Sequence, residues 1–231
     1  NYSPNFDLKK RPSSKIKYLI FHYTGMKSDK SAIKKLTDIN SKVSCHYYID
    51  QKGKIIQMVP ELYVAWHAGQ SFWGKDKSLN KKSIGIEISN PGHQHGYKNF
   101  NKKQIYSLIK LSKKLIKKYS IKNKYILGHS DIAPLRKKDP GEKFPWKILS
   151  KKNIGIWHNY KKKIKNRFID IKSTDLKNEF FFNLRKYGYS INSKSLLDKR
   201  KIVKVFQMRF RPENVNGIID FETYDILKTL K

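Results

Sequence analysis

The sequence predicts an α/β fold, with a mixed central β-sheet flanked by helices and a small C-terminal domain of three helices. Apolar and alternating runs typical of strands recur through the N-terminal part of the chain, together with one long amphipathic helical pattern. Beyond residue 173 only helical patterns recur. We therefore expect an N-terminal domain over residues 1–150, a basic linker over 151–172 and a three-helix domain over 173–231.

The first strand is expected over the apolar run from Ile16 to Phe21, which ends at His22 where a Thr-Gly pair turns the chain. A short helix is then expected from Ser28 to Asp38. Ser28 or Asp29 would cap it, because short polar side chains accept hydrogen bonds from the free N–H groups of a first turn.

The middle of the chain supplies a hairpin, a central strand and the longest helix. Two alternating runs, Cys45 to Asp50 and Lys54 to Val59, flank Gln51-Lys-Gly53 and predict the hairpin. Ser83 to Ser89 alternates between isoleucine and smaller or polar residues, which predicts the central strand. From Asn101 to Tyr119, apolar residues recur at helical spacing and lysines occupy the opposite face.

The C-terminal part reads differently. The lysine-rich stretch from Leu149 to about Ile171 has few apolar positions, so we interpret it as a connection between domains. Helices are predicted over Asp175 to Tyr187, which Gly188 ends, and over Ser195 to Phe210. A last helix is expected after Asp220, an N-cap residue type.

A candidate metal site follows a further strand, predicted over Tyr125 to Leu127. His129 and Asp139 offer an imidazole nitrogen and a carboxylate oxygen, which zinc binds readily, and a catalytic zinc keeps one position open for water. An extended backbone would point Lys137 to the same side as Asp139, with Lys138 pointing away. A third ligand must come from elsewhere in the chain.

His22 is the best candidate for that ligand, because the end of a buried central strand faces a cleft. The alternative is that His22 is an ordinary packed histidine. Glu87 lies within the predicted central strand, on the face opposite its isoleucines. Burying a carboxylate at such a position costs free energy unless the group is paired with a cation or has a role in catalysis. Either this face is solvated, or Glu87 is a general base beside a metal-activated water.

Five motifs in fixed order now carry a resemblance to a known family. They are Phe21 to Thr24, Cys45 to Ile49, Trp66 to Gly69, Ile84 to Glu87, and His129 to Asp139. Together they resemble the zinc-dependent N-acetylmuramoyl-L-alanine amidases of the type 2 family, the AmpD and AmiD-like enzymes. The resemblance covers about residues 14 to 150.

The resemblance implies one zinc ion per catalytic domain, held by His22, His129 and Asp139. It also implies that Glu87 is the catalytic glutamate and that Lys137 is the family's lysine near the metal. The substrate would be peptidoglycan, cut at the amide between the lactyl group of N-acetylmuramic acid and L-alanine. Some relatives that have lost a zinc ligand only recognise peptidoglycan. All three ligand positions are intact here, which favours an enzyme over such a noncatalytic recognition protein.

Three further residues are candidates for contact with substrate. His67 lies in a loop-like stretch that resembles the family's substrate-facing edge, with a structural role as the alternative. Cys45 occupies a position where some branches of the family carry a tyrosine. Asn90 directly follows the predicted central strand.

The remaining polar candidates are given supporting roles. We expect His46 to be a packing residue rather than a ligand. His93 and His95 would form a cleft wall rather than a second metal site. Asp131 lies two residues after His129 and suits a capping or supporting role.

The net charge of +33 has two interpretations. Lysines are scattered along the whole chain, as a codon bias toward A and T would produce. Alternatively, a basic surface holds the protein on the carboxylates of peptidoglycan. We recognise no nucleic-acid motif and expect no nucleic-acid partner. The sequence leaves the oligomeric state open.

Composition and the first residues of the sequence bear on where in the cell the protein acts. No apolar run reaches transmembrane length, no signal sequence is visible, and a single cysteine excludes an internal disulfide. We expect a cell-envelope or periplasmic location, with the cytoplasm as the alternative. The C-terminal part resembles the three-helix peptidoglycan-binding module, through motifs at 184–189, 205–207 and 216–223.

Overall fold

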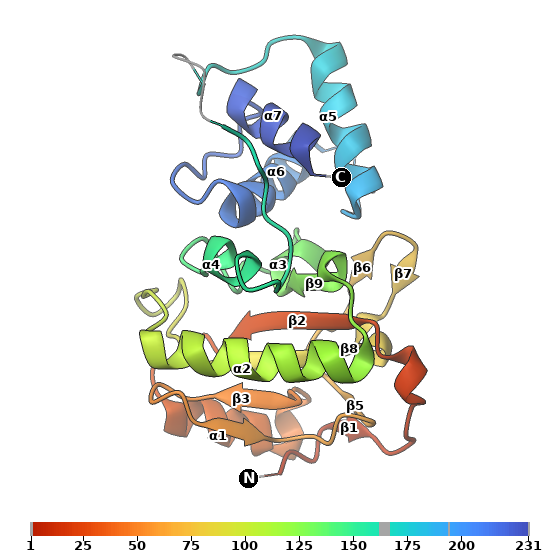
Figure 1. The fold of residues 1–231 in the computed structure, drawn as a ribbon, viewed down its shortest axis with the longest axis vertical. Coiled ribbons are helices and arrows are strands. Elements are labelled where there is room, and N and C mark those ends of the chain that lie inside the picture. Colours follow the sequence, from red (N-terminus) through yellow and green to blue (C-terminus); the bar gives the residue numbers. More distant parts are fainter. Residues whose placement is uncertain (1, 162–166, 194, 231) are drawn as a thin grey trace.

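The computed structural model describes residues 2–161, 167–193 and 195–230 (Figure 1). Residues 162–166, which belong to the predicted linker, lie outside the described residues, as does residue 194 of the predicted C-terminal domain. Among the described residues, no helix is both long and apolar enough to cross a membrane.

The central sheet of the described chain has the strand order β4-β3-β8-β2-β9. β2 (Tyr18–Tyr23) lies parallel to both β8 (Ser83–Ile88) and β9 (Ile126–Gly128). β3 (Tyr47–Ile49) is parallel to β8, whereas β4 (Ile55–Gln57) is antiparallel to β3. The sheet is therefore mixed, which confirms the predicted fold class.

The two faces of this sheet are covered by different helices. α2 (Lys102–Tyr119) packs its apolar stripe on Leu19 of β2 and on the isoleucines of β8. α1 (Asp29–Thr37) packs on the opposite face, where Tyr48 of β3 contacts its buried residues. Glu87 points to this second face, because it pairs with Tyr48 in register.

Capping residues define where these two helices begin. The Ser28 hydroxyl accepts a hydrogen bond from the backbone N–H of Ser31, and the Asn101 side chain accepts one from that of Gln104. In both helices the third residue bonds back to the cap, which completes a capping box. The predicted starts of both helices are confirmed to within a residue.

Four strands and two helices of the described chain were not predicted, because they are too short to show a period. β1 (Phe6–Asp7) pairs with β5 (Val64–Ala65), and β6 (Phe72–Trp73) pairs with β7 (Asp76–Lys77). The short helices are α3 (His129–Ile132) and α4 (Trp146–Ser150).

Three helices follow the predicted linker: α5 (Thr174–Tyr187), α6 (Leu196–Phe210) and α7 (Phe221–Thr229). They lie together beyond β9 and α3, at the end of the molecule opposite α1 (Figure 1). Asp220 caps α7 by accepting a hydrogen bond from the N–H of Thr223. The three predicted C-terminal helices are therefore present in the structure.

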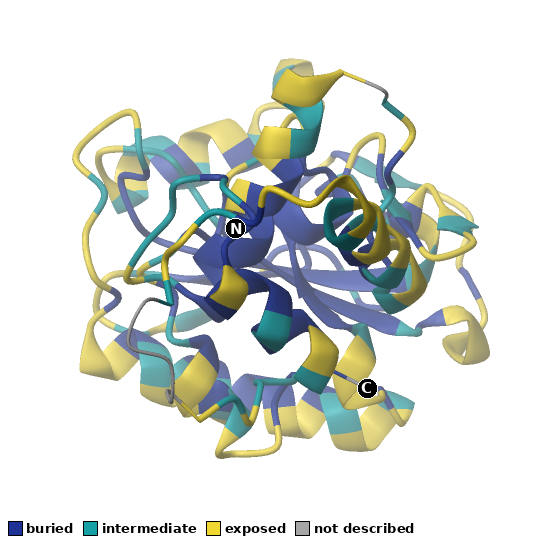
Figure 2. Cartoon of the chain, turned by 90° about the horizontal axis from the view of Figure 1, so that it is seen from above, coloured by how far each residue is buried: buried dark blue, intermediate teal, exposed yellow. Residues whose placement is uncertain are grey.

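These helices share one hydrophobic core with the sheet. Phe180 and Phe206 belong to the same buried cluster as Ile20 and Leu127. Ile154 of the predicted linker is itself fully buried against the α2 side of the sheet. Buried residues lie toward the inside of the molecule, while the outer faces of the helices are exposed (Figure 2). The domain boundaries at 150 and 172 stay a prediction.

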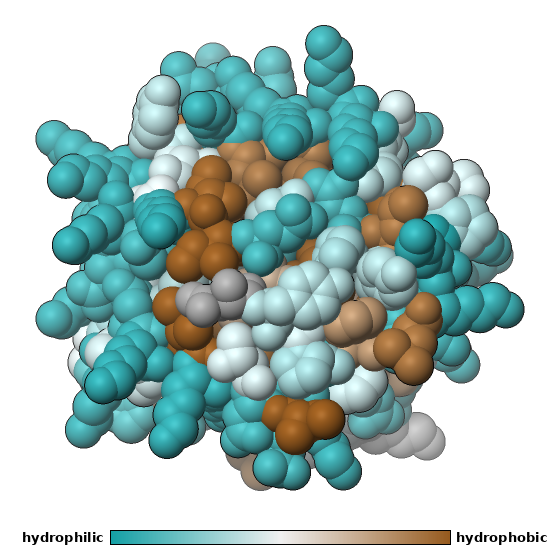
Figure 3. Space-filling view, turned by 90° about the horizontal axis from the view of Figure 1, so that it is seen from below, coloured by the Kyte–Doolittle hydropathy of each residue, from teal (hydrophilic) through white to brown (hydrophobic). Residues whose placement is uncertain are grey.

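The surface is largely hydrophilic. Seen from below, the rim is covered by hydrophilic side chains, and hydrophobic ones emerge between them in smaller groups (Figure 3). This distribution matches a chain whose lysines are spread over every segment.

Candidate active site

Three buried side chains that the sequence predicted as metal ligands meet at the ends of the parallel strands. His22 Nδ1 lies 2.9 Å from His129 Nδ1 and 3.1 Å from Asp139 Oδ2. His129 Nδ1 lies 3.0 Å from the same carboxylate oxygen. Among the described residues, these three form the group of ligand-type atoms that is compact enough to hold a metal ion.

Strand pairing brings the three residues together. Phe21 pairs with Gly128, so that the next residue of each strand, His22 and His129, projects from the same edge. The backbone N–H of Ser130 donates to the carbonyl oxygen of Asp139 at 2.8 Å. A Cβ at Gly128 would lie 2.6 Å from Pro140, so the absence of a side chain lets the segment that bears Asp139 approach.

Hydrogen bonds fix which nitrogen of each imidazole is free. His22 Nε2 lies 3.0 Å from His67 Nδ1, and His129 Nε2 lies 3.1 Å from the carbonyl oxygen of Ala68. A carbonyl only accepts, so His129 Nε2 carries a proton, and in the neutral ring its Nδ1 presents a lone pair. If His22 Nε2 likewise donates to His67, both inward nitrogens present lone pairs, as metal-binding imidazoles do.

The protonation states also suit a cation. Burial and the neighbouring His129 lower the pKa of His22 to about 4, so its ring is neutral near pH 7. Burial alone would raise the pKa of the Asp139 carboxyl, but His129 and His22 lower it below its usual range. Two imidazoles and a carboxylate are a zinc-type donor set, whose atoms a tetrahedral ion would hold roughly 3.3 Å apart. The observed spacing fits such a group.

Glu87 lies on the strand next to His22, its direct partner in the parallel pair. Its Oε2 is buried and has no hydrogen-bond partner among the described residues. Burial and the nearby Asp139 raise its pKa well above the usual value, while Lys137 and Lys35 oppose that shift. Glu87 is thus a carboxylate held ready to accept a proton, and its face is a cavity wall rather than open solvent.

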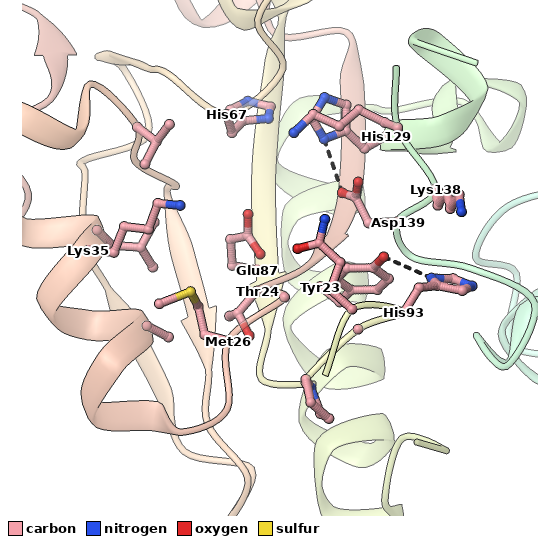
Figure 4. A pocket seen from close by; sticks show the side chains of 18 of the residues that line it. Tyr23, Thr24, Met26, Lys35, His67, Glu87, His93, His129, Lys138 and Asp139 are labelled. Atoms are coloured by element: carbon pink, nitrogen blue, oxygen red, sulfur yellow. Dashed lines mark hydrogen bonds and ion pairs between the residues drawn. The ribbon is translucent and has the colours of Figure 1, made fainter. Parts of the chain in front are cut away.

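A cavity of about 400 Å³ opens in front of these residues. Glu87, His129 and Asp139 line it, and Lys35 extends toward Glu87 from α1 (Figure 4). Lys137 lines the cavity as expected, but so does Lys138. Residues 137–138 lie outside any strand, and the turn that follows begins at Asp139, so the two lysines are not held on opposite sides as a strand would hold them.

His67 lines the cavity, yet both of its ring nitrogens are engaged inside the protein. Nδ1 faces His22, and Nε2 lies 3.1 Å from the hydroxyl oxygen of Ser83. The Ser83 hydroxyl in turn donates to the carbonyl oxygen of Leu79 at 2.7 Å. A Cβ at Gly85 would lie 2.4 Å from the His67 ring, so this glycine makes room for it on the central sheet. His67 is placed to orient His22.

The other two candidates for substrate contact lie behind the cavity wall. Cys45 is fully buried against Ala32 and Tyr48, and burial raises the pKa of its thiol well above the usual value. A direct substrate contact by Cys45 is at odds with this burial. The Asn90 amide donates to the carbonyl oxygen of Lys98 at 2.8 Å and accepts from the N–H of Gly92 at 3.0 Å. Asn90 thereby shapes the loop that forms one cavity wall.

Tyr23 and Arg136 line the cavity although no role is predicted for them from the sequence, and His93, expected in a cleft wall, lines it as well. The Tyr23 hydroxyl lies 2.9 Å from His93 Nδ1, and His93 Nε2 lies 3.0 Å from Glu142, which fastens the loop around residue 93 to the cavity edge. Arg136 donates to the carbonyl oxygens of Ala68 and Gln70. Tyr23 could have been noted as the neighbour of His22, whereas Arg136 stands among too many other cations to be distinguished.

An α/β sheet that places a buried His-His-Asp group beside an unpartnered glutamate defines a hydrolytic enzyme with a site compatible with a metal ion. The model of the N-acetylmuramoyl-L-alanine amidase family matches residues 12–142, more than half of the chain. The protein belongs to this family, as an AmpD/AmiD-like type 2 amidase, which confirms the resemblance found in the sequence.

Relatives share most of the chain's length. AmiD of Escherichia coli is 37% identical over 236 residues, covering 94% of this chain and 82% of AmiD. AmpD of Haemophilus influenzae is 33% identical over 163 residues, covering 62% of this chain and 85% of AmpD.

Solved structures agree with these relatives. The E. coli AmiD complex with anhydro-N-acetylmuramic acid-L-Ala-D-gamma-Glu-L-Lys has a TM-score of 0.82 at 35% identity, covering 97% of this chain and 91% of that one. AmpDh3 of Pseudomonas aeruginosa has a TM-score of 0.83 at 30% identity, covering 98% and 95%. Both likenesses extend over the C-terminal helices as well as the sheet.

Proposed function

We propose that the protein hydrolyses the amide bond between the lactyl group of N-acetylmuramic acid and L-alanine in peptidoglycan or its muropeptide fragments, using one zinc ion. Water adds across the bond, so that the lactyl carboxyl group and the free amine of alanine are the products. The observation that carries this proposal is the unpartnered Oε2 of Glu87 beside the His22-His129-Asp139 group.

The zinc would be held by His22, His129 and Asp139, since the two Nδ1 atoms and the Asp139 Oδ2 converge. The Nε2 atoms of both histidines are hydrogen-bonded to other groups. When bound, the ion supplies Lewis-acid polarisation of the substrate carbonyl and lowers the pKa of water toward neutrality. The protein's contribution is to lower the pKa of His22, which keeps that ring neutral, and to orient both imidazoles through their hydrogen bonds.

Glu87 and Lys137 would move the proton and stabilise the charge. Glu87 takes the proton from the attacking water and passes it to the leaving amine, a transfer that its raised pKa favours. Lys137 borders the same cavity and would face the oxyanion that develops on the substrate carbonyl.

Lys137→Ala should lower kcat about 100- to 1000-fold, the usual cost of removing one donor to an oxyanion. Initial rates on a purified anhydro-muropeptide, followed by chromatography, measure this effect. Lys138→Ala is the matched control, since the neighbouring lysine borders the same cavity and should matter only a few-fold. A near-wild-type rate for Lys137→Ala would remove Lys137 from the mechanism.

His67→Phe should weaken zinc binding by about 10- to 100-fold, as the loss of a partner that orients a metal-ligating histidine usually does. Phenylalanine fills the space but offers His22 Nε2 no acceptor. Competition with a chromophoric chelator measures the affinity, and the exposed His95→Phe is the control. If His67 instead contacted substrate, the variant would raise KM and leave zinc affinity unchanged.

The cavity suits an anionic substrate. Lys35, Arg136, Lys137 and Lys138 border it, whereas the carboxylates at its floor are Glu87 and Asp139. Stem peptides carry free carboxylates, and the solved AmiD complex contains such a fragment. Because peptidoglycan is the substrate, the cell envelope is the expected place of action, with cytoplasmic recycling of fragments as the alternative.

The C-terminal helices would serve as a peptidoglycan-binding unit. On a polymeric substrate, a second attachment point raises the effective concentration of cleavable amide bonds near the active site. Their sequence motifs support this role, which is separate from the chemistry at Glu87.

Mass spectrometry of muropeptides incubated with the zinc-supplied protein tests the proposed function. Release of free stem peptide and of the sugar with its lactyl carboxyl group is the expected result. Intact muropeptides from a protein that has bound zinc would overturn the proposal and favour the noncatalytic recognition protein instead.

A further inference from the structure

A second carboxylate, Asp131, lies behind the metal-ligand group and belongs to the same short helix as His129. It is almost completely buried, with an exposed fraction of 1%. Its Oδ2 accepts a hydrogen bond from the backbone N–H of Gly128 at 2.8 Å, which closes the first turn of α3. The capping role expected for Asp131 is thus present, but it uses only part of this carboxylate.

The remaining bonds to Asp131 come from the C-terminal helices. The Tyr189 hydroxyl, just after α5, donates to Oδ1 at 2.5 Å. The Arg209 guanidinium, from α6, forms a buried ion pair with Oδ2. Arg209 also donates to the carbonyl oxygen of Ile126 in β9 at 3.1 Å and stacks 4.2 Å from the centre of the Trp146 ring. We call Asp131, Tyr189 and Arg209 the Asp131 latch.

The latch is bonded to the turn from Gly128 to Asp139, which supplies two of the three ligand residues. His129 is the first residue of α3, and the next residue, Ser130, holds the backbone of Asp139. Asp131 accepts a hydrogen bond from the backbone N–H of Gly128, the residue directly before His129. Any rotation of α3 would therefore move the His129 ring and the Asp139 carboxylate together.

We propose that the C-terminal helices position the metal-ligand turn through the Asp131 latch, so that zinc affinity depends on Tyr189 and Arg209. The inference rests on the proposed zinc site. It gives these helices a task at the active site itself, in addition to any attachment to polymer. Neither residue touches substrate or metal, so both are positioning residues.

A second buried ion pair provides a matched control. Arg211 pairs with Asp220 at 2.6 Å, and each of the two aspartates also accepts a backbone N–H at the start of a helix, Asp220 from Thr223 in α7 and Asp131 from Gly128 before α3. Both pairs are almost fully buried, but the Arg211 pair lies wholly within the C-terminal helices. Removing either ion pair should lower the stability of the fold, whereas only removing the latch pair should weaken zinc binding.

The test compares Arg209→Met with Asp131→Asn against Arg211→Met with Asp220→Asn. Each double variant removes both charges of its pair, and asparagine keeps an oxygen that can accept the same backbone N–H. Glu222, which also lies 3.8 Å from Arg211, keeps its ion pair with Arg167 in the control variant. Zinc dissociation constants are measured by chelator competition at a temperature where circular dichroism shows every variant folded. We expect about a tenfold weaker zinc affinity for the latch variant, the lower end for groups that support metal ligands.

Two single substitutions with smaller effects on stability test the same inference if the double variants do not fold. Tyr189→Phe removes only the hydroxyl bonded to Asp131, and Tyr187→Phe is its control, since the Tyr187 ring stacks near Tyr189. A several-fold loss of zinc affinity is expected for Tyr189→Phe alone.

Two results would overturn the inference. One is unchanged zinc affinity in the folded latch variants, and the other is an equal loss in latch and control variants. If wild-type protein itself failed to bind zinc, the metal site proposed above would fall, and the latch with it.

Discussion

Glu87→Gln should lower kcat by about 100- to 10,000-fold, the usual range for losing a general base, and should leave zinc affinity unchanged. Glutamine has the same shape but cannot take a proton from water. The effect should be large because Glu87 lies beside His22 in the sheet and its buried Oε2 has no hydrogen-bond partner among the described residues. Initial rates on muropeptides and chelator competition for zinc give the two quantities separately.

Glu142→Gln is a suitable control for this variant. Glu142 is also a carboxylate near the cavity, but it is bonded to His93 at the rim rather than exposed to the reacting bond. Its substitution should change kcat only a few-fold. If Glu87→Gln kept more than about a tenth of the activity, Glu87 would not be the base.

Asp139→Asn should abolish hydrolysis because it should remove zinc. The amide lacks the negative charge that offsets the ion, and the loss should exceed the roughly 100-fold upper limit seen for groups outside the ligand shell. Metal content after dialysis and chelator competition measure it. Unlike Glu87→Gln, this variant should lose zinc and activity together, so the two substitutions separate metal binding from proton transfer.

The control for Asp139→Asn is Asp76→Asn. Asp76 forms ion pairs with Lys17 and Lys82, away from the cavity, and its loss should leave zinc binding as in wild type. If Asp139→Asn bound zinc as tightly as wild type, Asp139 would not be a ligand, and the proposed ligand set would have to be revised.

Local signals made the sheet and the long helices predictable. Ser28 and Asn101 carry side chains that cap helices, and the isoleucines of the central strand alternate with a period of two. Such features depend on residues close in sequence. The helix that begins at His129 has four residues, too few to show a period, and it was missed.

The supporting residues of the site could not be predicted in the same way. His22 and His67 are 45 positions apart, and their hydrogen bond exists only once β2 and the loop before β8 are folded together. The place of Cys45 in a motif predicts a substrate contact, but α1 packs over this residue and buries its thiol. The family resemblance named the ligand positions, whereas their orientation required the structure.

The C-terminal helices show a similar limit. Their periodicity predicts three helices correctly, yet nothing in it shows that Phe180 and Phe206 share a core with Ile20 and Leu127. A lysine-rich stretch suggests a loose connection, although Ile154 within it is fully buried. Composition describes what a segment is made of but not what lies against it.

The order of the chain gives the Asp131 latch a further meaning during synthesis. Tyr189 and Arg209 follow Asp131 by 58 and 78 residues. A ribosome therefore releases all three metal-ligand residues well before the side chains that hold their turn in place. A nascent or prematurely ended chain that stops short of Arg209 carries the whole catalytic set without this support. A chain that stops short of Arg209 should therefore bind zinc more weakly than one that includes it, if the latch acts as proposed.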